Sequence, residues 1–222
     1  MSGEGAEHGK KTLRDERCTQ LLEAARRVFA QKGYHAATVD DVTRAAGVAK
    51  GTFYLYFGEK RAAFYELIRQ FFELVTDVGR SVSRDVATKS EYFARVEQAA
   101  SSLAKLFREN RDLVRLVYRE SMGMDDQLEA MVRDFYRRMA AVEADNVRLG
   151  IELGLLRDDL NPLLVAYAHI GIVERVLLQS IFDRSFPEIS DLVHQLITLS
   201  YDGVRRREGE QLAPRERDAV AR

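Results

Sequence analysis

The sequence is poor in the residues that mark several classes of protein: its 222 residues include no tryptophan, one cysteine and three prolines. A single cysteine, Cys18, excludes an internal disulfide and a four-cysteine zinc site, and it fits a reducing compartment. Three prolines and 14 glycines are too few turn residues for a loop-rich β-sandwich. Hydrophobic residues make up 46% and charged residues 31% of the chain, so a packed core is expected and disorder is not the default.

Long apolar runs are scarce as well. The longest covers residues 163–173, whereas a bilayer-spanning helix needs about 20 residues. Residues 1–17 are polar and contain no signal-peptide segment. We therefore expect a cytoplasmic protein without a membrane partner. The net charge of −1 hides a basic segment over residues 1–61 and an acidic remainder, which is a modest indication of nucleic-acid contact.

Apolar residues recur at three- and four-residue spacing along almost the whole chain, and no strand-like alternation of useful length occurs. The sequence therefore predicts an all-α fold of about nine helices. The expected helices cover residues 14–32, 38–46, 49–57, 64–78, 92–110, 113–120, 125–154, 162–184 and 189–204.

Composition divides the chain into four parts. We expect a flexible N-terminal arm over residues 1–11, a part with three helices over 12–60, a larger helical part over 61–207, and a flexible tail over 208–222. Two interpretations fit the basic residues near the start of the chain: an arm that follows DNA, or a solvated end. These residues are Lys10, Lys11, Arg14 and Arg17.

The helix expected over residues 162–184 is apolar nearly all round. Such a helix must be covered on more than one side. A second subunit is the economical cover, because only one more helix follows in the chain, and a central position in a monomer is the alternative. Gly171 would let a crossing helix approach closely.

A regular apolar seam runs through residues 125–154, where apolar positions alternate by four and three residues and are interrupted only by Asn146. A buried polar group without a partner costs about 1–3 kcal/mol. Asn146 therefore either fixes the helix register or belongs to a ligand site. Aromatic and flexible side chains typical of ligand sites occur nearby: Tyr92, Phe107, Tyr118, Met131, Phe135 and Met139.

Two more polar residues interrupt the apolar surface of the helix that follows Pro162. Glu174 lies on a largely apolar arc, and His169 lies on the other side of the helix. Glu174 could equally pair with an arginine at a dimer interface. The sequence predicts a mostly apolar effector cavity within residues 90–182, with these candidate ligand-binding residues: Tyr118, Phe135, Met139, Asn146, His169 and Glu174.

Residues 38–57 read TVDDVTRAAGVAKGTFYLYF, which predicts two short helices joined at Gly47. Phe53 and Phe57, four residues apart, anchor the second helix inward. A short helix that carries donors and no acidic residue suits the major groove of DNA, although a plain helical hairpin inside a bundle has the same periodicity. The outward donors are Lys50, Thr52, Tyr54 and Tyr56, and Lys60 follows as a further phosphate-neutralising cation.

Residues 21–64, and above all GYHAATVDDVTRAAGVAKGTFYLYFGEKRAAF over residues 33–64, closely resemble the DNA-binding domain of the TetR family of bacterial transcriptional regulators. The resemblance implies a homodimer on a near-palindromic operator, and a regulator, usually a repressor, that responds to a small molecule. It also implies that residues 12–60 form the helix-turn-helix DNA-binding domain and that residues 61–207 form the effector-binding and dimerisation domain. The sequence departs from the family pattern at Thr43, Ala49, Leu55 and Glu59. The DNA-contact positions carried over are Thr38, Lys50, Gly51, Thr52, Tyr54, Tyr56 and Lys60.

Catalytic and metal-binding motifs are missing. The sequence contains no GxSxG, HExxH, P-loop or GxGxxG pattern, and its histidines do not pair at ligand spacing. We therefore expect no enzyme activity, no cofactor and no metal. Cys18 is expected to be an inert core thiol, and His35 an exposed loop residue unless it touches phosphate. The alternative function is a helical small-molecule-binding protein or enzyme without a DNA role.

Overall fold

The computed structural model describes residues 4–83, 86–121 and 125–205, and within them the side chains apart from those of residues 4–13, 121 and 190. This part of the chain is all-α, with nine helices and one isolated antiparallel bridge between Leu156 and Arg205. The helices are α1 (Glu4–Lys32), α2 (Val39–Ala46), α3 (Lys50–Phe57), α4 (Lys60–Arg80), α5 (Lys89–Glu109), α6 (Arg111–Ser121), α7 (Asp126–Glu152), α8 (Pro162–Phe182) and α9 (Ile189–Asp202).

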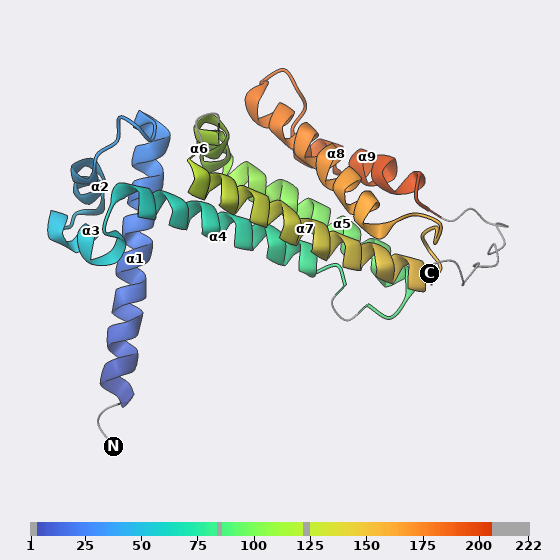
Figure 1. The fold of residues 1–222 in the computed structure, drawn as a ribbon, viewed down its shortest axis with the longest axis horizontal. Coiled ribbons are helices and arrows are strands. Elements are labelled where there is room, and N and C mark those ends of the chain that lie inside the picture. The colour runs from blue at the N-terminus through green and yellow to red at the C-terminus, as the bar shows by residue number, and fades with distance from the viewer. Residues whose placement is uncertain (1–3, 84–85, 122–124, 206–222) are drawn as a thin grey trace, which may run out of the picture.

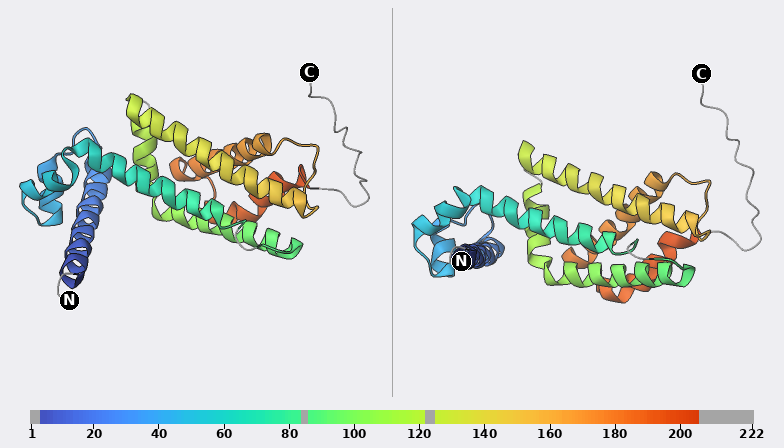
Figure 2. Two further views of the ribbon diagram at one scale, coloured as in Figure 1. Left: turned by 60° about the horizontal axis from the view of Figure 1, so that its bottom comes forward. Right: turned by 90° about the horizontal axis from the view of Figure 1, so that it is seen from below.

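The nine helices form two parts joined by α4 (Figure 1). Helices α1 to α3 gather at one end of the molecule around the start of α4, and α4 then runs on into the bundle that it forms with α5 to α9. The two further views in Figure 2 show the same elongated arrangement, and the left view shows the first part of α1 projecting from the rest. The predicted all-α class is confirmed.

Most helix ends lie within a few residues of the positions predicted from the sequence, and α1 is the exception. It begins at Glu4 rather than near Arg14, so residues 4–11 of the expected flexible arm are helical in the structure. The expected tail over residues 208–222 lies outside the described residues. The four-part division of the chain stays a prediction.

Aromatic side chains form the core of the N-terminal part. Phe29, Phe53 and Phe64 are almost completely buried. The rings of Phe29 and Phe64 meet edge to face with centroids 6.1 Å apart, and Tyr34 lies 4.6 Å from Phe64. Because Phe64 belongs to α4, this core fixes α1 to α3 on the first turns of the helix that enters the bundle.

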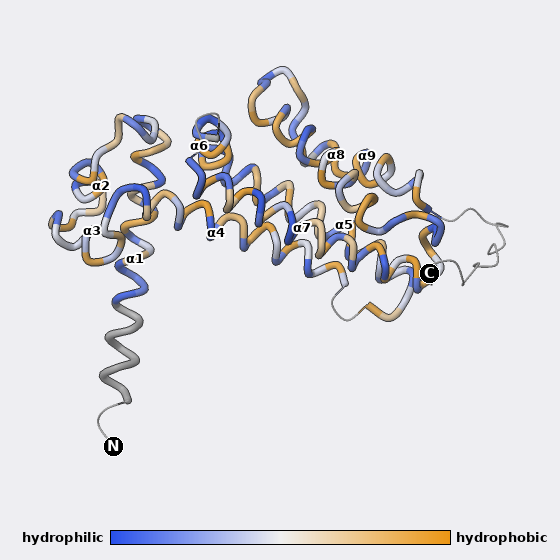
Figure 3. Tube along the Cα trace, viewed as in Figure 1, coloured by the Kyte–Doolittle hydropathy of each residue, from blue (hydrophilic) through white to orange (hydrophobic). Residues whose placement is uncertain are grey.

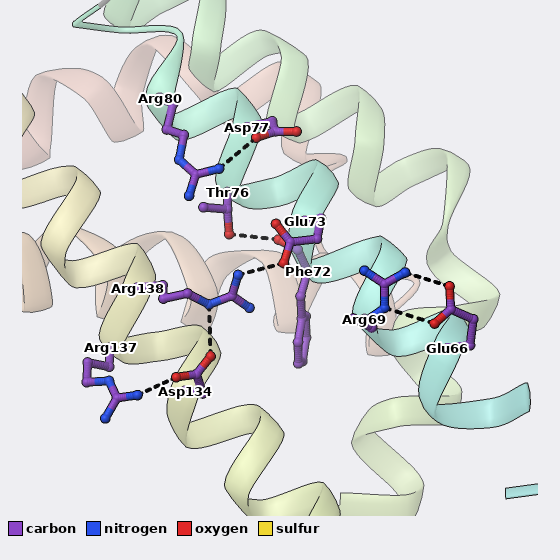
Figure 4. Close-up of polar contacts among 10 residues, drawn as sticks. All are labelled: Glu66, Arg69, Phe72, Glu73, Thr76, Asp77, Arg80, Asp134, Arg137 and Arg138. Carbon is purple, nitrogen blue, oxygen red and sulfur yellow. Dashed lines mark hydrogen bonds and ion pairs between the residues drawn. The ribbon is translucent and has the colours of Figure 1, made fainter. Parts of the chain in front are cut away.

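The seam predicted over residues 125–154 packs α7 between α4 and α8. Phe135 of α7 stacks on Phe72 of α4 with ring centroids 4.0 Å apart. On the same pair of helices, Arg138 bridges Glu73 of α4 at 2.6 Å and Asp134 of α7 at 2.9 Å (Figure 4). The pairing of α4 with α7 is therefore held by an apolar contact and a cross-helix ion pair.

Helix α8 carries a large apolar surface that no described residue covers. Its length and apolar composition would allow α8 to span a membrane, but core helices of soluble proteins can have the same length and composition. Only 33% of the most apolar 18-residue stretch of α8 is buried. Hydrophobic colouring recurs along α8 and α9 (Figure 3). The exposed apolar side chains here are Leu163, Leu164, Tyr167, Ile172 and Phe182 on α8 and Leu199 on α9.

Candidate DNA-binding surface and effector cavity

The surface of α3 carries exposed donors on a helix anchored from behind. Phe53 is completely buried and Tyr56 packs partly against the core, whereas Tyr54 is 47% and Leu55 79% exposed. Gly51 is also exposed, and a Cβ built on it would meet no atom within 4 Å. Nothing inside the chain therefore requires glycine at this position.

An ion pair across the turn orients the first residue of α3. The Lys50 ammonium lies 2.8 Å from a carboxylate oxygen of Asp40 in α2, and both side chains are well exposed. The hydrogen bond to Asp40 raises the pKa of Lys50. Because exposed ion pairs contribute little to stability, Lys50 can exchange Asp40 for a phosphate at small cost.

Thr38 begins α2 through a reciprocal pair of hydrogen bonds. Its hydroxyl oxygen accepts from the Asp41 amide at 3.1 Å, and the Asp41 carboxylate accepts from the Thr38 amide at 3.1 Å. This capping box satisfies amides that a helix start leaves unpaired. The hydrogen bond from Lys32, followed by that from Thr38, lowers the pKa of Asp41 to about 2. Gly47 ends the helix with φ 68°, a left-handed conformation that glycine adopts without strain.

Lys60 is half-buried, and its ammonium is directed at the loop between α1 and α2. Its ammonium donates to the carbonyl oxygens of Tyr34 at 2.7 Å and Ala37 at 2.8 Å, with a longer contact to His35 at 3.4 Å. It also lies 4.4 Å from the centre of the Tyr34 ring, and burial lowers its pKa. Since an ammonium has three donors, a phosphate contact would require Lys60 to give up one of these acceptors.

A cavity of about 390 Å³ lies inside the bundle, a size within the range of small-molecule sites. Helices α4 to α9 all contribute to its wall, which is mostly aliphatic and aromatic. Five of the six predicted ligand-binding residues line it: Tyr118, Phe135, Met139, His169 and Glu174. Asn146 is not among the lining residues.

Asn146 lies completely buried behind Glu143. Its amide nitrogen donates to the Gly79 carbonyl oxygen at 3.1 Å and to a Glu143 carboxylate oxygen at 3.2 Å. The first contact ties α7 to α4, and the second orients a residue that does line the cavity. The structure thus places Asn146 as a support of the cavity wall.

His169 joins the cavity wall to α9. Its Nε2 lies 2.8 Å from the Ser200 carbonyl oxygen, and its Nδ1 lies 2.8 Å from the Glu143 carboxylate. A carbonyl oxygen only accepts, so Nε2 carries a proton, and the contact with Glu143 needs one proton more. Whether imidazole or carboxyl holds that second proton, the net charge of the pair is zero.

Glu174 has a different environment. Its carboxylate accepts a hydrogen bond of 2.5 Å from the Tyr136 hydroxyl. Burial, followed by this hydrogen bond, raises the pKa of Tyr136, so the phenol keeps its proton and remains the donor. Among the described residues, no arginine, lysine or histidine pairs with Glu174. Its charge therefore faces the cavity without a cationic partner.

Comparisons with known proteins agree with this architecture. Residues 21–67 match the family model described as bacterial regulatory proteins, tetR family. Residues 21–67 form a DNA-binding domain of that family. The chain is 26% identical over 186 residues to YdgC, an uncharacterized HTH-type transcriptional regulator of Bacillus subtilis, which covers 83% of this chain and 91% of YdgC. The chain is accordingly a DNA-binding transcriptional regulator.

Two solved structures show the same TetR-like fold. FadR from Bacillus subtilis in complex with stearoyl-CoA superposes with a TM-score of 0.71 at 20% identity, covering 84% of this chain and 98% of FadR. The SmeT–triclosan complex, from the Stenotrophomonas maltophilia repressor SmeT, superposes with a TM-score of 0.72 at 16% identity, covering 93% of this chain and all of SmeT (100%). At these identities the likeness establishes the fold.

Helix α6 links the cavity to the DNA-binding part. Arg26 of α1 donates to both carboxylate oxygens of Asp112 at 2.9 and 2.5 Å, and His35 lies 3.0 Å from Glu120. At the other side of α6, Arg111 and Arg115 donate to the Ser180 and Ile181 carbonyl oxygens at the end of α8. Val114, Val117 and Tyr118 of α6 line the cavity.

Sequence reasoning missed three polar residues of the cavity wall: Tyr136, Glu143 and Tyr201. Tyr136 and Glu143 lie beside Met139 on α7, so the helical period could have placed them on the same face. No signal marks Tyr201, whose pKa is raised by burial and then by the charge of Glu143. Cys18 is half-buried as a packing residue, and burial, followed by the charge of Glu66, raises its thiol pKa.

Proposed function

We propose that the chain is a cytoplasmic, homodimeric repressor that leaves a near-palindromic operator when a small, largely apolar effector fills the bundle cavity. The observation that carries this proposal is a helix-turn-helix with exposed donors, joined through α6 to an apolar cavity of about 390 Å³. A ligand that alters α6 or α8 would change the positions of Arg26 and His35, and with them the DNA-binding part.

The uncovered face of α8 supports the homodimer. Leu164 is 66% exposed, and Ala168 and Gly171 follow it at helical spacing, so a second copy of α8 could approach closely there. Arg175 continues the same face. A two-fold dimer would present two copies of α3 about one DNA turn, roughly 34 Å, apart or at a multiple of it. A near-palindromic operator follows from that symmetry.

The residues proposed to contact DNA are those on or beside α3: Thr38, Lys50, Gly51, Thr52, Tyr54 and Tyr56. Lys50 is the proposed phosphate-neutralising cation, because it is exposed and its partner Asp40 is replaceable. Lys60 is proposed to act mainly by holding the loop between α1 and α2 against α4.

The proposed effector class follows the cavity wall and the ligands of two structural relatives. Stearoyl-CoA, bound by FadR, and triclosan, bound by SmeT, both have large apolar parts. An effector here would bury its apolar part among Phe72, Phe135, Val173 and neighbouring side chains. We propose no enzyme activity, because the relatives are regulators.

Fluorescence anisotropy on duplexes from the DNA flanking the chain's own coding region tests the proposal. We expect one short, near-palindromic segment to bind far more tightly than a scrambled duplex, and transcription from a promoter overlapping it to fall when protein is added. Sedimentation should give a dimer at micromolar concentration. A stable monomer would contradict the dimer. Absence of any preferred duplex, also after selection from random sequences, would contradict the regulator.

A further inference from the structure

The cavity wall has an unusual balance of charge. Among the described residues, those that line it and can ionise are Glu143, His169, Glu174 and three tyrosines, with no lysine or arginine. The Glu143–His169 pair is neutral as a unit, because one shared proton completes the contact between them. Glu174 is then the one charge on the described wall that is left without a counterion.

We propose that the cavity selects lipophilic cations, and that Glu174 is the residue that recognises the positive charge. This inference rests on the proposed effector site and names its ligand class. A cation of suitable size would place its apolar body among the aliphatic and aromatic side chains and its charge beside the carboxylate of Glu174.

The surroundings of Glu174 favour a cation rather than a neutral polar group. Tyr136 donates one hydrogen bond to the carboxylate, which orients Glu174 and leaves its negative charge in place. The aromatic rings of Phe72, Phe135 and Tyr136 also lie in the wall, and ring faces attract cations. Both attractions are stronger in a largely apolar cavity than in water, because the local dielectric constant is lower.

The same wall disfavours anions. A carboxylate or phosphate inside the cavity would approach Glu174, and the described part of the wall has no arginine or lysine to compensate its charge. Moving a charge out of water without a partner costs free energy. An anionic amphiphile of the same chain length should therefore bind more weakly than the neutral alcohol. The cation should bind more tightly than both.

Calorimetric titration of the full-length, DNA-free protein with decyltrimethylammonium, 1-decanol and decanoate tests this order. The three probes share one alkyl chain and differ in the charge of the head group. We expect decyltrimethylammonium to bind at least about tenfold more tightly than 1-decanol, and decanoate to bind most weakly. Equal or tighter binding of decanoate would overturn the proposal, and so would failure of all three probes to bind.

Three variants assign the effect to one side chain. Glu174→Gln keeps an acceptor for Tyr136 and removes the charge, so the preference for the cation over the alcohol should fall to less than about threefold while the affinity for 1-decanol stays the same. Glu174→Lys should reverse the order in favour of decanoate. Glu152→Gln removes an exposed carboxylate elsewhere on α7 and should change nothing. A cation preference that survives in Glu174→Gln would overturn the assignment.

The titration separates this inference from the proposed function. If decyltrimethylammonium is preferred but a saturating amount leaves operator affinity unchanged, the charge selectivity stands and the repressor mechanism fails. If 1-decanol binds and releases the operator while the cation shows no preference, the mechanism stands and the selectivity fails.

Discussion

The two parts of the molecule use polar side chains in opposite ways. Around α3 the donors face outward, and the contacts that hold them are local, as in the Thr38–Asp41 cap and the Lys50–Asp40 pair. In the bundle, polar side chains face inward and join helices distant in sequence, as in His169–Glu143 and Tyr136–Glu174. The first arrangement suits an extended polyanion and the second a small enclosed ligand.

The aromatic core beneath α3 offers the strongest way to separate the two parts. Phe53 is completely buried, so Phe53→Ala should destabilise the N-terminal part by about 3–5 kcal/mol and abolish DNA binding while the cavity still binds ligand. Hydrogen exchange should rise in α1 to α3 and stay unchanged in α7 and α8. Leu55→Ala, a truncation of a 79% exposed side chain on the same helix, is the matched control for stability. Equal loss of ligand binding in Phe53→Ala would show that the parts are not separable.

If α3 contacts DNA phosphates, the DNA affinity of the protein should depend on salt concentration. Each phosphate contact contributes about 0.9 to the slope of log K against log salt concentration. Lys50→Ala removes one contact from each protomer, so the slope for a dimer should become shallower by about 1.8. Affinity for cognate and scrambled duplexes should fall together, unless Lys50 also reads a guanine edge, in which case cognate binding falls further. Lys105→Ala, on the exposed surface of α5, serves as the comparison. An unchanged slope for Lys50→Ala would mean that this lysine is merely solvated.

The packing of the chain does not require glycine at position 51, so we attribute this glycine to close approach of DNA. Because a Cβ there would meet no atom of the chain within 4 Å, Gly51→Ala should raise the helix-forming tendency of α3 by up to about 1 kcal/mol. The same variant should weaken operator binding, since the added methyl group would lie against DNA. Thermal unfolding and anisotropy give the two results. Full DNA affinity in a stabilised Gly51→Ala protein would remove Gly51 from the interface.

The smallest expected effect concerns pH. The pKa of Asp41 is lowered to about 2, against about 3.9 for an unperturbed aspartate. A lowered folded-state pKa means that the contribution of Asp41 to stability is fully present above about pH 4 and is lost as the pH falls through about 2. Asp41→Asn should therefore lower the melting temperature by a constant amount from neutral pH down to about pH 4.

The difference between Asp41→Asn and the unaltered protein should vanish toward pH 2. Asp77→Asn, which alters an exposed carboxylate paired within α4 (Figure 4), should show little effect at any pH, since such pairs contribute little. A melting difference for Asp41→Asn that persists at pH 2 would mean that the carboxylate charge is not what supports the α2 cap.

Sequence reasoning succeeded where structure is local. Thr38, Gly47 and the Phe53–Phe57 spacing fix the helix-turn-helix within twenty or so residues, because caps and turns depend on neighbours along the chain. In the bundle, the sequence predicted several cavity residues but not their contacts. The pattern placed His169 and Glu174 near a cavity but gave no partners for them, since Glu143 and Tyr136 lie on another helix and only tertiary packing brings them together.

Two polar residues make long-range contacts that the sequence pattern did not predict, and the physical reason is the same for both. Lys60 follows a predicted DNA-binding helix and looks like a surface cation, yet the loop before α2 folds three carbonyl oxygens around it. Asn146 interrupts an apolar seam, as a ligand-binding group would, yet it donates to α4 and to Glu143 behind the cavity wall. In both cases a long-range contact, invisible to periodicity, decides where the polar atoms go.

The most direct test of the proposed mechanism is the reciprocal coupling between cavity and DNA. Operator affinity is measured with and without a saturating amount of the tightest-binding decyl probe, and probe affinity is measured with and without operator. We expect operator affinity to fall by about 5- to 150-fold, and probe affinity to fall by the same factor when operator is bound, because both sites share one coupling free energy. Operator affinity that is unchanged by a demonstrably bound probe would contradict the proposed mechanism.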